Sequence, residues 1–122
     1  MNEEKNLSTE ETIPLAVQNH KKNNFKEAEI LYKKILNINP DHFESIFLLG
    51  ALSAQTKNFD LAKQLLQKAI HIKPHYAEAH YNLGIVFKEL GEHQKAISCC
   101  EKAIHIQPNY VEAHNNLGAL FN

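Results

Sequence analysis

The chain contains eight histidines and two cysteines, the side chains that most often bind transition metals or act as nucleophiles. The histidines of two pairs, His80 with His114 and His71 with His105, are each separated by 34 residues. A zinc enzyme would instead place two histidines one helical turn apart beside a carboxylate. The regular separation indicates a repeated sequence, and we expect neither a metal site nor a cofactor.

The two cysteines, Cys99 and Cys100, are adjacent. Neighbouring side chains on a helix point about 100° apart, so a disulfide between them would distort the backbone. We expect two free thiols, which suits a reducing compartment, with Cys100 at a core position and Cys99 nearer the surface. The sequence has no phosphate-binding glycine loop and no nucleophile elbow. We therefore expect a chain that is not an enzyme.

The composition is that of a single globular domain: 122 residues, 43% hydrophobic and 22% charged. A net charge of −1 provides no field that would attract nucleic acid or an anionic membrane. The N-terminal segment MNEEKNLSTEET is acidic and polar, unlike a signal peptide, and no apolar run is long enough for a membrane span. We expect a cytoplasmic protein that binds neither nucleic acid nor membranes.

The sequence repeats with a period of 34 residues. A proline recurs at Pro40, Pro74 and Pro108, and an alanine recurs at Ala28, Ala62 and Ala96. A Leu-Gly pair recurs as Leu49 with Gly50, Leu83 with Gly84, and Leu117 with Gly118. This period divides the chain into units 9–42, 43–76 and 77–110, followed by a partial unit, 111–122. Residues 1–8 lie outside the pattern, and we expect a disordered tail there.

Within each unit the apolar residues follow helical spacing and predict two helices. In the second unit these helices are expected near 43–56 and 59–72. The small residues at the shared glycine and alanine positions would let the two helices of a unit approach closely. In the first unit Pro14 falls inside the first helix, which begins either near Thr12 or at Ser8 with a kink.

This pattern resembles the tetratricopeptide repeat family over residues 9–122. The matching residues are Leu15, Ala16, Ala28, Tyr32 and Pro40; Leu49, Gly50, Ala62, Ala69 and Pro74; and Leu83, Gly84, Phe87, Ala96, Ala103 and Pro108. The chain departs from the family pattern where Ile46, His80, His114 and Cys100 replace the usual aromatic residues. The resemblance implies an all-α, right-handed α-solenoid of antiparallel helix pairs, whose first helices line a concave groove.

The resemblance also implies which side chains face that groove and bind a partner. The candidates are Phe47, Leu48, Glu78, Tyr81, Asn82, Ile85, Glu112, Asn115 and Asn116. Asn82 and Asn116 would begin a ladder of amides, similar to that in the repeat arm of O-GlcNAc transferases, that donates to and accepts from a peptide backbone. The alternative is a polar consensus residue that faces water.

Two further groove features each have a structural alternative. Glutamates at the second position of every unit form an acidic stripe that would prefer basic partners, or they only complement the dipoles of the helices that they begin. The apolar and aromatic side chains of the patch Phe47, Leu48, Tyr81 and Ile85 would anchor a partner, or they pack between first helices.

We therefore expect a protein–protein interaction scaffold that binds an extended peptide. Relatives that bind chaperones hold a C-terminal carboxylate with basic residues, but Ile13, Glu78 and Glu112 occupy those positions, so we expect no such binding. The unfinished fourth unit leaves Leu117 and Phe121 without a following helix. It favours a truncated chain, with two alternatives: self-association of this end into a homodimer, or a substrate-recruiting arm of a larger glycosyl- or sulfo-transferase.

Overall fold

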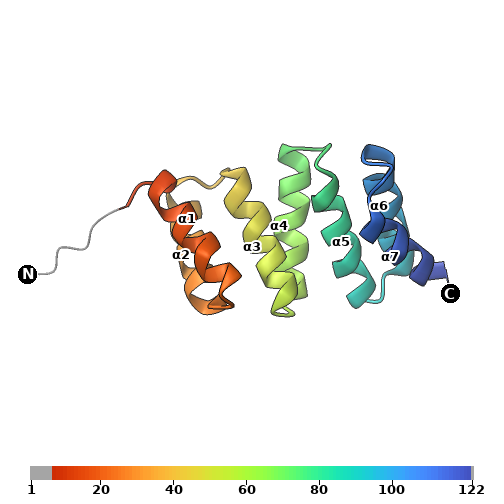
Figure 1. Cartoon of the computed structure of the whole chain (residues 1–122), viewed down its shortest axis with the longest axis horizontal. Helices are drawn as coiled ribbons and strands as arrows, with labels where there is room; N and C mark the ends of the chain where they lie inside the picture. Colours follow the sequence, from red (N-terminus) through yellow and green to blue (C-terminus); the bar gives the residue numbers. More distant parts are fainter. Residues whose placement is uncertain (1–6, 122) are drawn as a thin grey trace, which may run out of the picture.

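The computed structural model describes residues 7–121 and contains, within that range, seven α-helices and no strand. The helices are α1 (Thr9–Lys21), α2 (Phe25–Ile38), α3 (Phe43–Gln55), α4 (Phe59–Ile72), α5 (Ala77–Glu89), α6 (His93–Ile106) and α7 (Val111–Phe121). They follow one another along the long axis of the molecule, with α1 and α7 at opposite ends (Figure 1). Each helix packs mainly against the preceding and following helix in the sequence, as expected for a solenoid. The predicted all-α repeat solenoid is confirmed.

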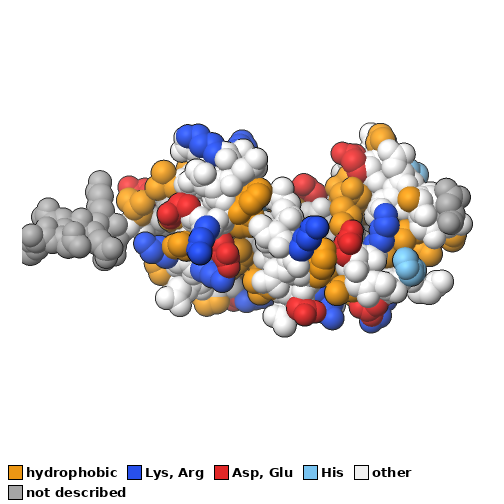
Figure 2. Space-filling view, turned by 90° about the horizontal axis from the view of Figure 1, so that it is seen from below, with side chains coloured by type: hydrophobic (Ala, Val, Ile, Leu, Met, Phe, Trp, Pro, Cys, Tyr) orange, Lys and Arg blue, Asp and Glu red, His pale blue; other side chains and the backbone are white. Residues whose placement is uncertain are grey.

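The surface is chemically mixed. The face drawn in Figure 2 carries acidic, basic and apolar side chains interspersed along its length. No helix among the described residues combines the length and the apolar character needed to cross a membrane.

Helix α1 begins at Thr9, so a start near Thr12 is wrong. Ser8 is the N-cap: its hydroxyl accepts the backbone N–H of Glu11 at 3.2 Å, and the Glu11 carboxylate accepts the backbone N–H of Ser8 at 3.1 Å. This reciprocal pair satisfies two backbone donors at the helix start. The cap fixes the first turn although Pro14 lies inside the helix.

The two helices of each pair are joined by a tight turn with a left-handed residue. This residue is Asn23 (φ 62°), Lys57 (φ 65°) and Gly91 (φ 78°) in successive pairs. Only Gly91 adopts this conformation without steric cost, because it has no Cβ. The turn geometry is therefore repeated although the residue type is not.

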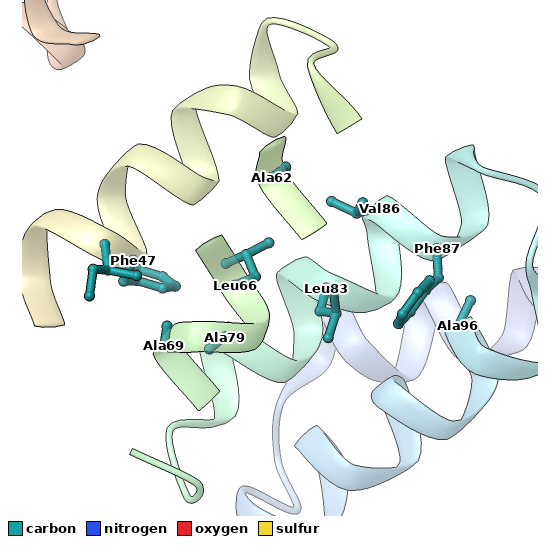
Figure 3. Packing of buried hydrophobic residues seen from close by; sticks show 10 residues of the cluster. Phe47, Ala62, Leu66, Ala69, Ala79, Leu83, Val86, Phe87 and Ala96 are labelled. Atoms are coloured by element: carbon teal, nitrogen blue, oxygen red, sulfur yellow. The ribbon is translucent and has the colours of Figure 1, made fainter. Parts of the chain in front are cut away.

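The largest core cluster lies where α3, α4, α5 and α6 meet. Leu66 of α4 is fully buried and lies near Ala79 and Leu83 of α5 (Figure 3). The glycines of α3 and α5 let the paired helix come close: a Cβ at Gly50 would lie 3.0 Å from Leu66 Cγ, and one at Gly84 would lie 3.3 Å from the Ala96 carbonyl oxygen. The close approach predicted from the small residues is confirmed at both positions.

Candidate functional site

The structure separates the predicted groove residues into buried and accessible side chains. Phe47 is 5% exposed and belongs to the core, where its ring lies 5.1 Å from that of Tyr76. This burial favours the packing alternative for Phe47. The remaining candidates are accessible to different degrees: Leu48, Tyr81, Asn82, Ile85 and Asn116 are half-buried, and Glu78, Glu112 and Asn115 are exposed.

Two open hollows lie between successive first helices of the repeat. The N-terminal hollow, of about 510 Å³, lies between α1 and α3 and is lined by Ile13, Pro14, Val17, Gln18, Lys21, Lys22 and Glu44. The C-terminal hollow, of about 340 Å³, lies between α5 and α7 and is lined by Tyr81, Glu112, Asn115, Asn116 and Ala119. The structure thus brings four predicted site residues together in the C-terminal hollow. Leu48, Glu78, Asn82 and Ile85 do not line either hollow.

An aromatic pair stands beside the C-terminal hollow. The rings of Tyr81 and Tyr110 lie 5.1 Å apart and are tilted by 37°. Burial raises the pKa of Tyr110 to about 12, and the charges of Glu78 and Glu112 act in the same direction. Burial also raises the pKa of Tyr81, with a further contribution from Glu112. Both phenols therefore stay protonated at neutral pH, and two carboxylates lie near them.

Sequence reasoning missed Tyr110. A signal was present in the sequence, because Tyr76 and Tyr110 both directly precede the first helix of a unit. In the structure the ring centroids of Tyr76 and Phe47 lie 5.1 Å apart, as do those of Tyr110 and Tyr81, although the first pair is T-shaped and the second is tilted. The tyrosine before α5 and the tyrosine before α7 therefore each contribute a ring to an aromatic cluster.

The two asparagines proposed as a ladder have different surroundings. Asn116 donates from Nδ2 toward Cys100 Sγ at 3.5 Å, and its Oδ1 accepts from Lys88 Nζ at 3.5 Å. The contact with Lys88 is long for a hydrogen bond and sulfur is a weak acceptor, so both can be exchanged for bonds to a ligand. Asn82 lies on α5, half-buried. The ladder stays a prediction.

The histidines and cysteines have structural surroundings. His80 and His114 each hydrogen-bond through Nε2 to the carbonyl oxygen of a proline, Pro74 or Pro108, at 2.8 Å. Burial raises the pKa of Cys99 to about 12, which keeps this thiol protonated and therefore a poor nucleophile at neutral pH. Within residues 7–121 no three His, Cys, Asp or Glu side chains are grouped as a metal would require.

Family models match three stretches of the chain. Models described as tetratricopeptide repeat match residues 77–110 and 19–42, and one described as TPR repeat matches residues 54–91. The chain belongs to the tetratricopeptide repeat family. No curated protein sequence matches this chain significantly.

Solved structures share this fold. A Thermobaculum terrenum O-GlcNAc transferase mutant is 30% identical with a TM-score of 0.85, over 90% of this chain and 21% of that chain. A crystal structure of MamA is 29% identical with a TM-score of 0.87, over 92% of this chain and 66% of that chain. This tetratricopeptide repeat chain thus spans less than two thirds of the length of both.

A third neighbour was solved with a peptide. It is the first TPR of Spaghetti (RPAP3) bound to the HSP90 peptide SRMEEVD, with a TM-score of 0.87 over 90% of this chain and 87% of that chain. The sequence identity is 20%, so this likeness concerns the fold alone.

Proposed function

We propose that this tetratricopeptide repeat chain is a protein-interaction scaffold that holds an extended segment of a partner along the surface of α1, α3, α5 and α7. The observation that carries the proposal is the presence of two open hollows between successive first helices, the N-terminal hollow and the C-terminal hollow. A chain laid across the first helices would enter both. The peptide held by the RPAP3 repeat supports this use of the fold.

Amide side chains would supply the contacts that do not depend on the partner's sequence. Asn82, Asn115 and Asn116 all lie on α5 or α7 and are exposed or half-buried. Each amide can donate and accept at once, as a peptide backbone requires. Affinity then comes from the backbone of the partner, and selectivity comes from the side chains that enter the hollows.

The test is to select, from a displayed library, linear peptides that bind the full chain, and then to measure their affinities. The double variant Asn82→Ala, Asn116→Ala removes two amides. Its affinity for the selected peptides should be about tenfold lower, because two hydrogen bonds to the ligand are lost. The matched control is Gln67→Ala with Gln94→Ala, which removes two exposed amides from α4 and α6. Equal affinity of both double variants would contradict the proposal, and circular dichroism would verify their helicity.

This groove should reject the type of peptide that the RPAP3 repeat binds. The positions that would hold a C-terminal carboxylate carry Ile13, Glu78 and Glu112, of which two would repel it. Isothermal titration of the chain with SRMEEVD should give no measurable heat of binding. Micromolar affinity for this peptide would refute the prediction.

The open C-terminal end favours a second role, self-association. Phe121 is 67% exposed, and a Cβ at Gly118 would meet no atom within 4 Å. Pairing of two copies through α7 would cover Leu117 and Phe121. Phe121→Glu should then lower the mass measured by light scattering to that of a monomer, whereas an unchanged mass counts against this role.

The likeness to one region of an O-GlcNAc transferase supports a third role, a substrate-recruiting arm within a larger enzyme. In that case the chain would deliver a bound segment to a catalytic domain in the same polypeptide. The sequence of the complete transcript decides this role: a catalytic domain beyond Asn122 supports it, and a stop codon there excludes it.

A further inference from the structure

Two successive aromatic clusters along the solenoid differ in the number of their rings and in the charge beside them. In the first cluster, Phe43, Phe47 and Tyr76 pack together, with ring centroids 5.0 to 6.2 Å apart. The chain itself supplies a cation there, because the Lys73 ammonium lies 4.4 Å from the centroid of Phe43. An ammonium over an aromatic face is an attractive cation–π contact.

The second cluster, one repeat later, has an aromatic pair without that cation. The backbone geometry is the same: the Tyr110 N–H donates to the Gln107 carbonyl at 3.1 Å, as the Tyr76 N–H donates to the Lys73 carbonyl at 3.2 Å. Gln107 therefore occupies the position of Lys73, and its side chain is neutral. The Tyr81 and Tyr110 rings remain beside a hollow that is open to solvent.

Negative charge surrounds this second aromatic pair. Glu112 lines the C-terminal hollow, and both Glu78 and Glu112 act on the Tyr110 hydroxyl. Neither glutamate takes part in an ion pair within residues 7–121, where the ion pairs are Lys33 with Glu29, Lys68 with Asp41 and Lys95 with Glu92. The basic residue Lys88 does not line the hollow; it donates to one of the lining residues, Asn116, at 3.5 Å. Negative charge therefore lies beside the two tyrosines, and Glu112 brings it into the hollow.

We propose that the C-terminal hollow binds an arginine side chain of an extended peptide partner. The guanidinium stacks on the Tyr81 and Tyr110 rings and pairs with Glu112, while Asn115 bonds to the adjacent peptide backbone. Arginine fits better than lysine because its planar group stacks on aromatic rings and offers paired donors to a carboxylate. This inference rests on the proposed function and specifies the chemistry of the partner.

The test is an NMR titration of the ¹⁵N-labelled full chain with two capped peptides of glycine and serine. One peptide has a single central arginine, and the other has citrulline, which has nearly the same shape without the charge. The arginine peptide should shift the amide signals of Tyr81, Tyr110 and Glu112. The citrulline peptide should bind about fivefold more weakly or worse, because it lacks the charge-dependent contacts.

Matched variants locate the site. Glu112→Gln should lower the affinity for the arginine peptide about fivefold. Glu101→Gln is the control, because it removes an exposed carboxylate of α6 that lines neither hollow, and it should change nothing. Gln107→Lys should lower the affinity as well, because it adds a positive charge of the chain beside the two tyrosines, at the position equivalent to Lys73. Raised salt should weaken binding to the wild type more than to Glu112→Gln.

Three results would overturn the inference: equal affinity for both peptides, signal shifts confined to the N-terminal hollow, or no shifts at millimolar peptide. The failure of the inference is distinguishable from failure of the proposed function. If library selection yields peptides that bind through Asn82 and Asn116 but contain no basic residue, the scaffold function is supported and the arginine site is refuted. If the arginine peptide shifts the amide signals of Tyr81 and Tyr110 while selection yields no peptide, the arginine site is supported and the extended groove is refuted.

Discussion

Helices α5 and α7 carry closely similar sequences but have very different surroundings. Both contain Glu-Ala-His and, two residues further on, Asn-Leu-Gly. Phe87 of α5 is 5% exposed, whereas Phe121, the equivalent residue of α7, is 67% exposed. A Cβ at Gly84 would meet α6 at 3.2 to 3.3 Å, whereas one at Gly118 would meet nothing within 4 Å.

The unequal exposure of these equivalent residues shows that burial in this molecule depends on neighbouring helices and not on the residue pattern of one helix. In a repeat solenoid each unit buries its apolar side chains only against adjacent units. Helix α5 lies between α4 and α6, whereas α7 contacts α6 without a following helix among the described residues. The same substitution should therefore have unequal effects in the two helices.

The largest expected difference concerns the two phenylalanines. Phe87→Ala should lower the free energy of unfolding by about 3–5 kcal/mol, because it opens a cavity in the core. Phe121→Ala should change it by about 0.5 kcal/mol or less, as for other exposed positions. Urea denaturation followed by circular dichroism measures both. Similar losses in the two variants would mean that α7 is covered in solution, for example by a second copy.

The two glycines should give the next largest difference. Gly84→Val should lower the free energy of unfolding by about 2–3 kcal/mol, because the new side chain must displace the Ala96 backbone and Cys99. Gly118→Val faces open space and should be neutral or slightly stabilising, because valine favours a helix more than glycine does. The measurement is the same denaturation experiment. A loss of stability in Gly118→Val as large as that in Gly84→Val would contradict this explanation.

The two histidines isolate the effect of burial on one hydrogen bond. His80 and His114 make the same 2.8 Å contact with a proline carbonyl, but His80 is 8% exposed and His114 is exposed. His80→Ala should lower the free energy of unfolding by about 2 kcal/mol, because a buried side chain is lost together with its hydrogen bond. His114→Ala should cost about 0.5 kcal/mol, because water can replace the imidazole. Equal melting temperatures of the two variants would contradict this explanation.

Most of the fold could be predicted from the sequence, because the residue pattern that predicts each helix and turn occurs several times along the chain. The expected helices 43–56 and 59–72 correspond to α3 and α4, which end or begin within one residue of these limits. The start of α1 could not be decided, because Pro14 argued for a later start and the Ser8 capping box was not recognised. The structure shows that this cap fixes the helix start.

The candidate site was less predictable, because repeat position alone does not determine exposure. Phe47 and Tyr81 occupy the same position in successive units, yet Phe47 is buried under Phe43 and Tyr76 while Tyr81 borders a hollow. One neighbouring residue that differs is Phe43, which is replaced by Ala77 in the next unit. The smaller Ala77 has no ring to cover Tyr81 as Phe43 covers Phe47.

The smallest expected effect concerns the contact between α5 and the start of α7. The Tyr110 pKa is raised to about 12 in the folded chain, mainly by burial, against an ordinary value of about 10. A phenol with a raised pKa holds its proton longer in the folded state than in the unfolded state. Its contribution to stability is therefore complete below pH about 10 and is lost as the pH rises toward 12.

The urea midpoint should consequently fall less between pH 9 and 11 in Tyr110→Phe than in the wild type. Other ionisable groups account for the fall that remains. The effect should be small, because Tyr110 is only half-buried and α7 is covered on one side. Repeating the series in 1 M salt separates the two causes: the part due to the charges of Glu78 and Glu112 should disappear, and the part due to burial should persist. If the wild type and the variant lose stability equally at high pH, Tyr110 is not held against α5 in solution. In that case the junction between α5 and α7 would be as open as the far side of α7.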